Sequence, residues 1–187
     1  VFQTTKSDVF EASGGGYTPD GTGNTGKNRV RGFELGLAGN ITPEWSMQGG
    51  VTILDSEILR SASNPDNVGK TLSNTAKFQA SFQTKYQVGP LALGFAVKHK
   101  GKRYGGQPDT APGFSTLADG SFVYSQPVPA YTVGDIFAEY QFNKNLDFRL
   151  NVNNVTNEDY YLAVYRSGSF LYKGDARQIV GTLNLRF

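Results

Sequence analysis

Two clusters of basic and phenolic residues are the part of this sequence best suited to chemistry. The first is the run 98–104, and the second lies near the end of the chain. Lysine and arginine form charge-assisted hydrogen bonds with anions, and tyrosine rings stack on other rings. The chemistry expected of both clusters is therefore non-covalent recognition. The candidate binding residues are Lys98, Lys100, Lys102, Arg103, Tyr104, Tyr165, Arg166, Tyr172 and Lys173.

Motifs for catalysis or metal binding fail on inspection. Residues 69–71 read Gly-Lys-Thr, but Asn64 stands where a phosphate-binding loop requires glycine, and no strand-to-helix pattern surrounds them. His99 is the only histidine and has no acidic neighbour in sequence, so a serine-hydrolase triad is possible only in principle. There is no cysteine and no histidine cluster. We expect no catalytic residue, no metal site and no covalent cofactor.

Composition narrows the class of protein further. The chain has 187 residues, enough for one domain, and a formal net charge of +2, which gives no reason to expect nucleic acid. No apolar run approaches the roughly 18 residues that a membrane helix needs. A membrane-spanning β-strand is not excluded, because it needs only about 9–11 residues of alternating pattern.

Strict alternation of apolar and polar residues is the main structural signal. It predicts antiparallel strands with one apolar and one polar face. Residues 1–10 have strand composition but alternate poorly, and they suggest the end of an eighth strand. The seven clear segments are 33–41, 45–53, 76–88, 91–97, 134–142, 146–152 and 179–187.

The connections between these segments alternate between short and long. In an antiparallel meander, one end of the sheet then carries tight turns and the other carries every long loop, as in the wall of an outer-membrane β-barrel. Aromatic residues fall at both levels, where they suit membrane interfaces: Trp45, Tyr86, Tyr140, Phe142 and Phe187 near the turns, and Tyr104, Tyr160, Tyr161 and Tyr172 near the loops. A soluble sandwich also alternates and is the competing fold. A soluble sandwich, however, does not need every apolar face to be free of charged residues, as the apolar faces of these segments are.

A family resemblance rests on five features: residues 29–34 (RVRGFE), Trp45, residues 151–161 (NVNNVTNEDYY), residues 174–178 (GDARQ) and the terminal Phe187. Together they resemble the closing strands of TonB-dependent siderophore receptors, most of all the ferric-catecholate type. The resemblance implies an all-β, transmembrane antiparallel barrel in the bacterial outer membrane. Residues 1–187 would form about eight up-and-down strands, the carboxyl-terminal part of a 22-stranded barrel. The plug domain and the TonB-contacting segment would precede Val1.

The resemblance also implies a function and partners. The protein would import a ferric siderophore, an anionic and often aromatic chelate, without any enzymatic step. Phe187 resembles the signal read by the barrel-assembly machinery, and membrane lipid and lipopolysaccharide would surround the barrel. A small stand-alone barrel for adhesion or structure, or a passive porin, remains an alternative. Basic residues above such a barrel can also simply pair with lipopolysaccharide phosphates or stay solvated.

Two further expectations concern the polar face. Many of its residues are small, which would leave a narrow barrel under-filled and favours a wide one. The charges lower on this face should satisfy one another or a plug, because an unpaired buried charge is costly. They are Glu34, Lys77, Lys85, Asp135, Glu139, Asp147 and Arg149.

Overall fold

The computed structural model describes residues 1–11, 23–62, 65–105, 126–165 and 170–187. Its main feature is a single antiparallel sheet of eight strands in the order β1-β2-β3-β4-β5-β8-β9-β12. These strands are β1 (Phe2–Phe10), β2 (Asn24–Asn40), β3 (Trp45–Arg60), β4 (Phe78–Val88), β5 (Leu91–Lys100), β8 (Tyr131–Asn143), β9 (Leu146–Asn153) and β12 (Gln178–Leu185). The predicted all-β meander is confirmed.

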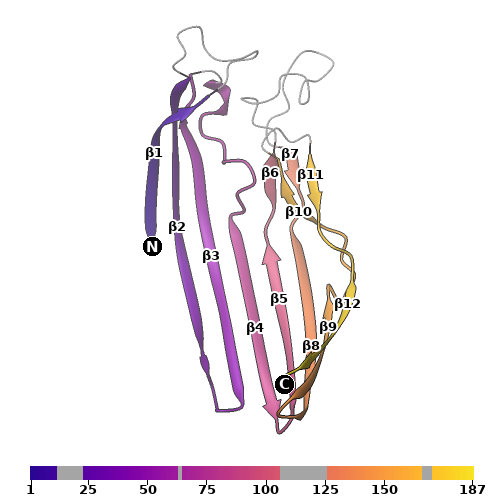
Figure 1. Ribbon diagram of the computed structural model, residues 1–187. Coiled ribbons are helices and arrows are strands. Elements are labelled where there is room, and N and C mark those ends of the chain that lie inside the picture. The colour runs from indigo at the N-terminus through magenta and orange to yellow at the C-terminus, as the bar shows by residue number, and fades with distance from the viewer. Residues whose placement is uncertain (12–22, 63–64, 106–125, 166–169) are drawn as a thin grey trace.

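Short elements lie at the loop end of this sheet. They are the 3-10 helix η1 (Pro65–Asn67), the strand pair β6 (Arg103–Gly105) and β7 (Gln126–Val128), and the hairpin of β10 (Tyr161–Val164) and β11 (Leu171–Lys173). All four short strands gather beside the long connections, whereas the opposite end of the sheet carries only tight turns (Figure 1). The predicted asymmetry between the two ends is therefore present.

The tight turns have local causes. At residues 41–44, the Thr42 hydroxyl accepts hydrogen bonds from the backbone N–H groups of Glu44 and Trp45, at 3.3 and 3.2 Å. Between β4 and β5 the turn needs Gly89, whose φ of 55° lies in the left-handed region. The β8–β9 turn is closed by Asn143, whose side chain accepts from the Asn145 N–H at 2.9 Å. Each turn keeps consecutive strands in register, so the two faces are continuous across the sheet.

The apolar face is not covered by a second layer in the part of the chain that the structure describes. Leu35 is 59% exposed, Phe95 45% and Leu183 66%. Cross-strand pairs such as Phe82 with Val97 extend this face from strand to strand. A sandwich would bury these side chains against an opposing sheet, so the arrangement excludes that fold for the described residues. It suits a sheet whose apolar face meets lipid.

Charged residues on this outward face begin only above the apolar band. Phe33 pairs with Ile53, and two residues earlier in β2, toward the loop end, Arg31 pairs with Asp55. The Arg31 Nε donates to Asp55 Oδ2 at 2.7 Å, and the next pair, Arg29 with Glu57, is also an ion pair. The outward cations of β2 are therefore neutralised by acids of β3 just above the last apolar pair.

Several boundaries differ from expectation. The segment predicted at 33–41 begins earlier, because β2 begins at Asn24, where it pairs with Phe10. The two long connections that follow segments 91–97 and 146–152 contain the short ladders β6–β7 and β10–β11. The last strand ends at Leu185 rather than Phe187, although the Arg186 N–H still donates to Asn145 O at 2.8 Å. Pairing of main-chain groups explains these extensions, and side-chain alternation does not reveal it.

None of the helices in the described part of the chain has the length and apolar character needed to cross a membrane.

Candidate ligand-binding site

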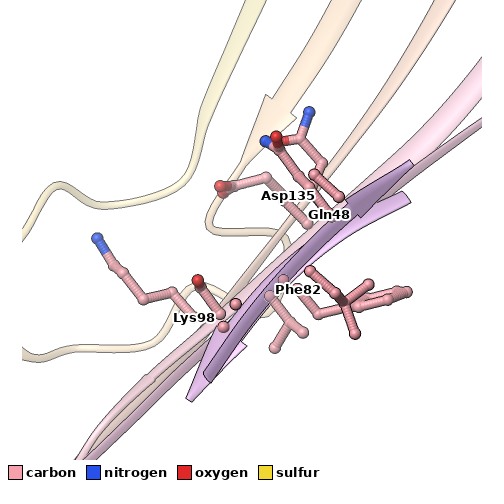
Figure 2. A pocket seen from close by; sticks show the side chains of 13 residues that line it. Gln48, Phe82, Lys98 and Asp135 are labelled. Atoms are coloured by element: carbon pink, nitrogen blue, oxygen red, sulfur yellow. The ribbon is translucent and has the colours of Figure 1, made fainter. Parts of the chain in front are cut away.

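The lysines at the upper end of β5 lie on the polar face. Lys98 pairs with Ser81 and Lys100 with Gln79, whereas their neighbour His99 pairs with Ala80 on the apolar side. Lys98 lies on one side of the sheet with Gln48 and Asp135, and Phe82 projects from the other (Figure 2). These two lysines therefore do not face the lipid side, where lipopolysaccharide phosphates would lie.

Beneath Lys98 an open groove of about 690 Å³ runs along the polar face. Its floor consists mainly of small residues contributed by four adjacent strands, and polar side chains stand at its margins. At Gly36 an added Cβ would meet nothing nearer than 3.8 Å, so space is left above this part of the wall. The groove leads along the sheet toward the basic end of β5.

The chain leaves the main sheet after Lys100, so the alternation of β5 does not extend to Tyr104. Lys102 lies outside any strand, exposed, with its Nζ 5.1 Å from the centre of the Tyr104 ring. Tyr104 belongs to β6 and pairs with Pro127 of β7. A cation and a phenol are thus presented together at the loop end, as recognition of an aromatic anion requires.

The second predicted cluster lies on the β10–β11 hairpin. Tyr172 pairs with Ala163 and is exposed, as is Tyr165 just beyond the hairpin's first strand. Lys173 is also exposed, and its Nζ lies 3.0 Å from Asp159, so an acid partly offsets its charge. Arg166 lies outside the described residues.

Arg103 connects the two clusters and differs from its predicted role. Its side chain has no exposed surface, and its guanidinium donates to the carbonyl oxygens of Leu162, at 2.7 Å, and Tyr161, at 2.6 Å. Burial lowers the pKa of Arg103, with Tyr131 acting in the opposite direction. Arginine nevertheless stays charged, because its usual pKa is so high. The structure thus places Arg103 in contact with the chain itself, between the basic run and the tyrosine hairpin.

The two most characteristic sequence motifs meet at the base of the last loop. Asn154 is buried, and its Nδ2 donates to Glu158 O and to Asp175 O, both at 2.9 Å. Asn157 Oδ1 accepts from the Arg177 N–H at 3.0 Å. Both asparagines have a positive φ, which asparagine tolerates better than most residues. The motifs therefore fix the path of the loop.

Charges on the lower polar face find partners within the sheet. Asp147 is 4% exposed and lies 3.1 Å from Arg186 and 2.7 Å from Asn184 Nδ2. Arg149 lies 4.0 Å from Glu139 and packs over the Phe137 ring at 4.4 Å. For Glu139, Asp147 and Arg149, these contacts agree with the expectation that the lower charges are satisfied within the wall. Over the described ranges, no three histidine, aspartate or glutamate side chains are grouped so as to hold a metal ion.

Three residues that support the candidate site were not predicted from the sequence to do so. Asn74, Tyr131 and Tyr160 surround Arg103 or its neighbours, and the Tyr131 and Tyr160 rings stack with centres 4.4 Å apart. Tyr160 had been expected at the lipid interface, but Tyr131 lies on the polar face, so Tyr160 packs inward. The sequence feature that could have indicated this inward packing is the glycine at position 174, because an added Cβ there would lie 2.1 Å from the Tyr160 ring.

Fold and surface chemistry together define a class of protein: the wall of an outer-membrane β-barrel. The model of the family "TonB dependent receptor-like, beta-barrel" matches residues 1–155. The chain belongs to the TonB-dependent receptors, a family of non-enzymatic outer-membrane transporters. The resemblance seen in the sequence is confirmed.

Relatives and solved structures agree with this assignment. The chain is 33% identical over 186 residues to the probable TonB-dependent receptor BfrD of Bordetella pertussis, covering 99% of the chain and 23% of that receptor. It is 31% identical over 163 residues to the catecholate siderophore receptor Fiu of Escherichia coli K12, covering 87% and 20%. The crystal structure of the siderophore receptor PiuA from Acinetobacter baumannii matches with a TM-score of 0.78 at 29% identity, covering 98% of the chain and 25% of PiuA. The chain thus spans about a quarter of the length of these receptors.

Proposed function

We propose that this chain is one sector of the wall of a TonB-dependent importer of ferric siderophores. The observation that carries the proposal is the placement of Lys98 and Lys100 on the lumen side of a lipid-facing sheet, below a loop end rich in tyrosines. Membership of the receptor family and the names of PiuA and Fiu support it. A ferric chelate with negative charge and aromatic rings would be held there by charge-assisted hydrogen bonds and stacking.

We propose further that the sheet belongs to a larger closed barrel. In the described part of the chain, β1 and β12 are each paired on one side only. Unpaired strand edges cannot be accommodated in lipid, where no water can satisfy the free N–H and C=O groups. Additional strands must therefore complete the wall, and the family resemblance implies 22 in all, around a plug. Coupling to TonB would then be made by a segment outside these 187 residues.

Within the siderophores, catecholates are the proposed class. The loop end combines exposed tyrosines with lysines, and Fiu is described as a catecholate receptor. Catecholate chelates present aromatic rings and carry net negative charge, so both kinds of side chain have a partner. Hydroxamate chelates offer no such rings, and binding of the two types therefore discriminates the proposed class.

The proposed function is tested in the full-length receptor with an iron-labelled ferric tris-catecholate and a ferric tris-hydroxamate. Reversing two charges with Lys100→Glu and Lys102→Glu should weaken catecholate binding and uptake at least about tenfold, since hydrogen bonds to charged groups contribute about 1.5–3 kcal/mol each. Lys144→Glu, in the turn at the opposite end, should change neither. Surface expression should remain normal in both variants.

Other outcomes would point elsewhere. If the double variant takes up the catecholate normally, the lysines are not part of the site. If the wild-type receptor binds no ferric chelate of either type, the importer proposal fails. Ion conductance through the purified barrel without TonB would instead indicate a passive pore.

A further inference from the structure

Arg103 is buried without a carboxylate partner among the contacts that the structure gives it. Its guanidinium instead donates to the backbone carbonyls of Tyr161 and Leu162, 58 and 59 residues further along the chain, and to Asn74 Oδ1 at 3.4 Å. Burying an uncompensated charge is costly, so these carbonyl dipoles must hold the cation in place. The side chain therefore joins β6 to the start of the β10 strand by its strongest available bonds.

Asn74 completes the same junction from a third segment. Its N–H donates to Tyr104 O at 2.8 Å, and its Oδ1 also accepts from the Val164 N–H at 3.3 Å. Its φ of 57° is a left-handed conformation in which a short amide side chain can fold back on nearby backbone. Asn74 thus contacts both β6 and β10 from the segment that precedes β4.

An aromatic floor lies below the junction. The Arg103 guanidinium carbon lies 5.6 Å from the centre of the Tyr131 ring, at the start of β8. Tyr131 is itself 4% exposed and packs against the Tyr160 ring. Any residue larger than glycine at position 174 would clash with the Tyr160 ring. The junction is therefore packed from below as well as hydrogen-bonded from the side.

We propose that Arg103 is a positioning residue. It holds together β6, β10 and the segment that precedes β4, so that the lysines of the 98–104 run and the tyrosines of the β10–β11 hairpin keep a fixed spacing for the ligand. This inference rests on the proposed function, because it assigns those residues to ligand binding. Only arginine suits the clamp, since its planar fork can serve two carbonyls and an amide oxygen at once, whereas lysine offers a single ammonium on a flexible stem.

The test uses the full-length receptor purified in detergent, in two measurements. The first is hydrogen exchange of the amides in segment 161–164 and at Asn74. The second is the affinity for a ferric tris-catecholate. Arg103→Lys keeps the charge but loses the fork, and it should speed exchange in both segments and weaken binding, each at least about tenfold. Asn74→Ala should do the same to a lesser degree.

The matched control is Arg177→Lys. Arg177 also lies at the loop end and also donates to a backbone carbonyl, that of Val155 at 3.4 Å, but it takes no part in the junction. Its variant should leave exchange in segment 161–164 unchanged. Arg103→Met provides a second variant in which the charge is absent, and it should match or exceed the effect of Arg103→Lys on exchange.

Two outcomes would overturn the clamp. Unchanged exchange with weakened binding would mean that Arg103 contacts the ligand directly. Faster exchange with unchanged binding would mean that the junction does not position the site. If the wild-type receptor binds no ferric chelate, the proposed function fails, but the exchange measurement still decides whether Arg103 holds the three stems together.

Discussion

The indole Nε1 of Trp45 donates a 2.7 Å hydrogen bond to the hydroxyl of Thr84 on the neighbouring strand. Thr84 in turn donates to Ser46 O at 2.9 Å. Thr84 is the residue that interrupts the apolar face of β4, and this contact explains why. A tryptophan at the short-turn end of a membrane strand needs a partner for its N–H, and a hydroxyl on the same outward face supplies one.

Replacing Thr84 with valine should therefore destabilise the receptor, although valine is the more apolar residue. Leaving the Trp45 N–H without its protein partner at an interface where water is near should cost about 1 kcal/mol. The measurement is the urea midpoint of the full-length receptor in lipid vesicles. Thr84→Ser keeps the hydroxyl and should stay close to wild type. Equal midpoints for the serine and valine variants would show that the hydrogen bond contributes nothing.

The direction in which the sheet faces can be tested by moving one charge across it. Ala80 lies on the apolar face opposite Val51, whereas Gln83 lies on the polar face opposite Gln48. Ala80→Arg should impair membrane assembly, because an arginine that faces the acyl chains is costly, up to about 2–4 kcal/mol at the bilayer midplane. Gln83→Arg should assemble normally. Heat-modifiable mobility of outer-membrane fractions distinguishes folded from unfolded barrel, and similar behaviour of the two variants would contradict the assigned faces.

The sequence predicts the strands of this structure better than the packing of its loop end. Alternation predicted the strands of the sheet because each residue faces one of two uniform surroundings, lipid or lumen. The same reasoning failed beyond Lys100, where the surroundings of a side chain come from distant segments. Arg103 stands in a run of solvated cations, and nothing local indicates that residues 161 and 162 bury it. Tyr160 was misplaced for the same reason, since its partner Tyr131 is 29 positions away in the chain.

Asn154 should be among the least replaceable residues of the loop end. Its side chain makes hydrogen bonds with Glu158 and Asp175, and its φ of 50° disfavours a residue with a Cβ and no amide. Asn154→Ala loses the bonds and adds strain, so unfolding should become easier by about 2–4 kcal/mol. Asn154→Gly relieves the strain but not the lost bonds, and it should fall between alanine and wild type. The denaturant midpoint of the full-length receptor gives the order, and an alanine variant as stable as the glycine variant would remove the backbone part of the argument.

A substitution at Gly94 tests why small residues line the polar face. Their number had suggested only a wide barrel, but at Gly94 an added Cβ would lie 2.4 Å from the Phe137 ring and 2.6 Å from Thr84 O. That ring carries Arg149, so Gly94→Ala should displace Phe137 and loosen the contact between the arginine and the ring, at a cost of about 1–3 kcal/mol.

Gly36 is the matched control for this substitution, because it lies on the same face with its nearest potential neighbour 3.8 Å away. Gly36→Ala should be neutral or slightly stabilising, since alanine loses less backbone freedom on folding than glycine does. Replacing the Phe137 ring with the smaller side chain of leucine in the Gly94→Ala background should recover part of the lost stability. The measurement is the denaturant midpoint of the full-length receptor. A Gly94→Ala variant as stable as wild type would mean that the ring is free to move and that Gly94, like Gly36, simply leaves space in the lumen.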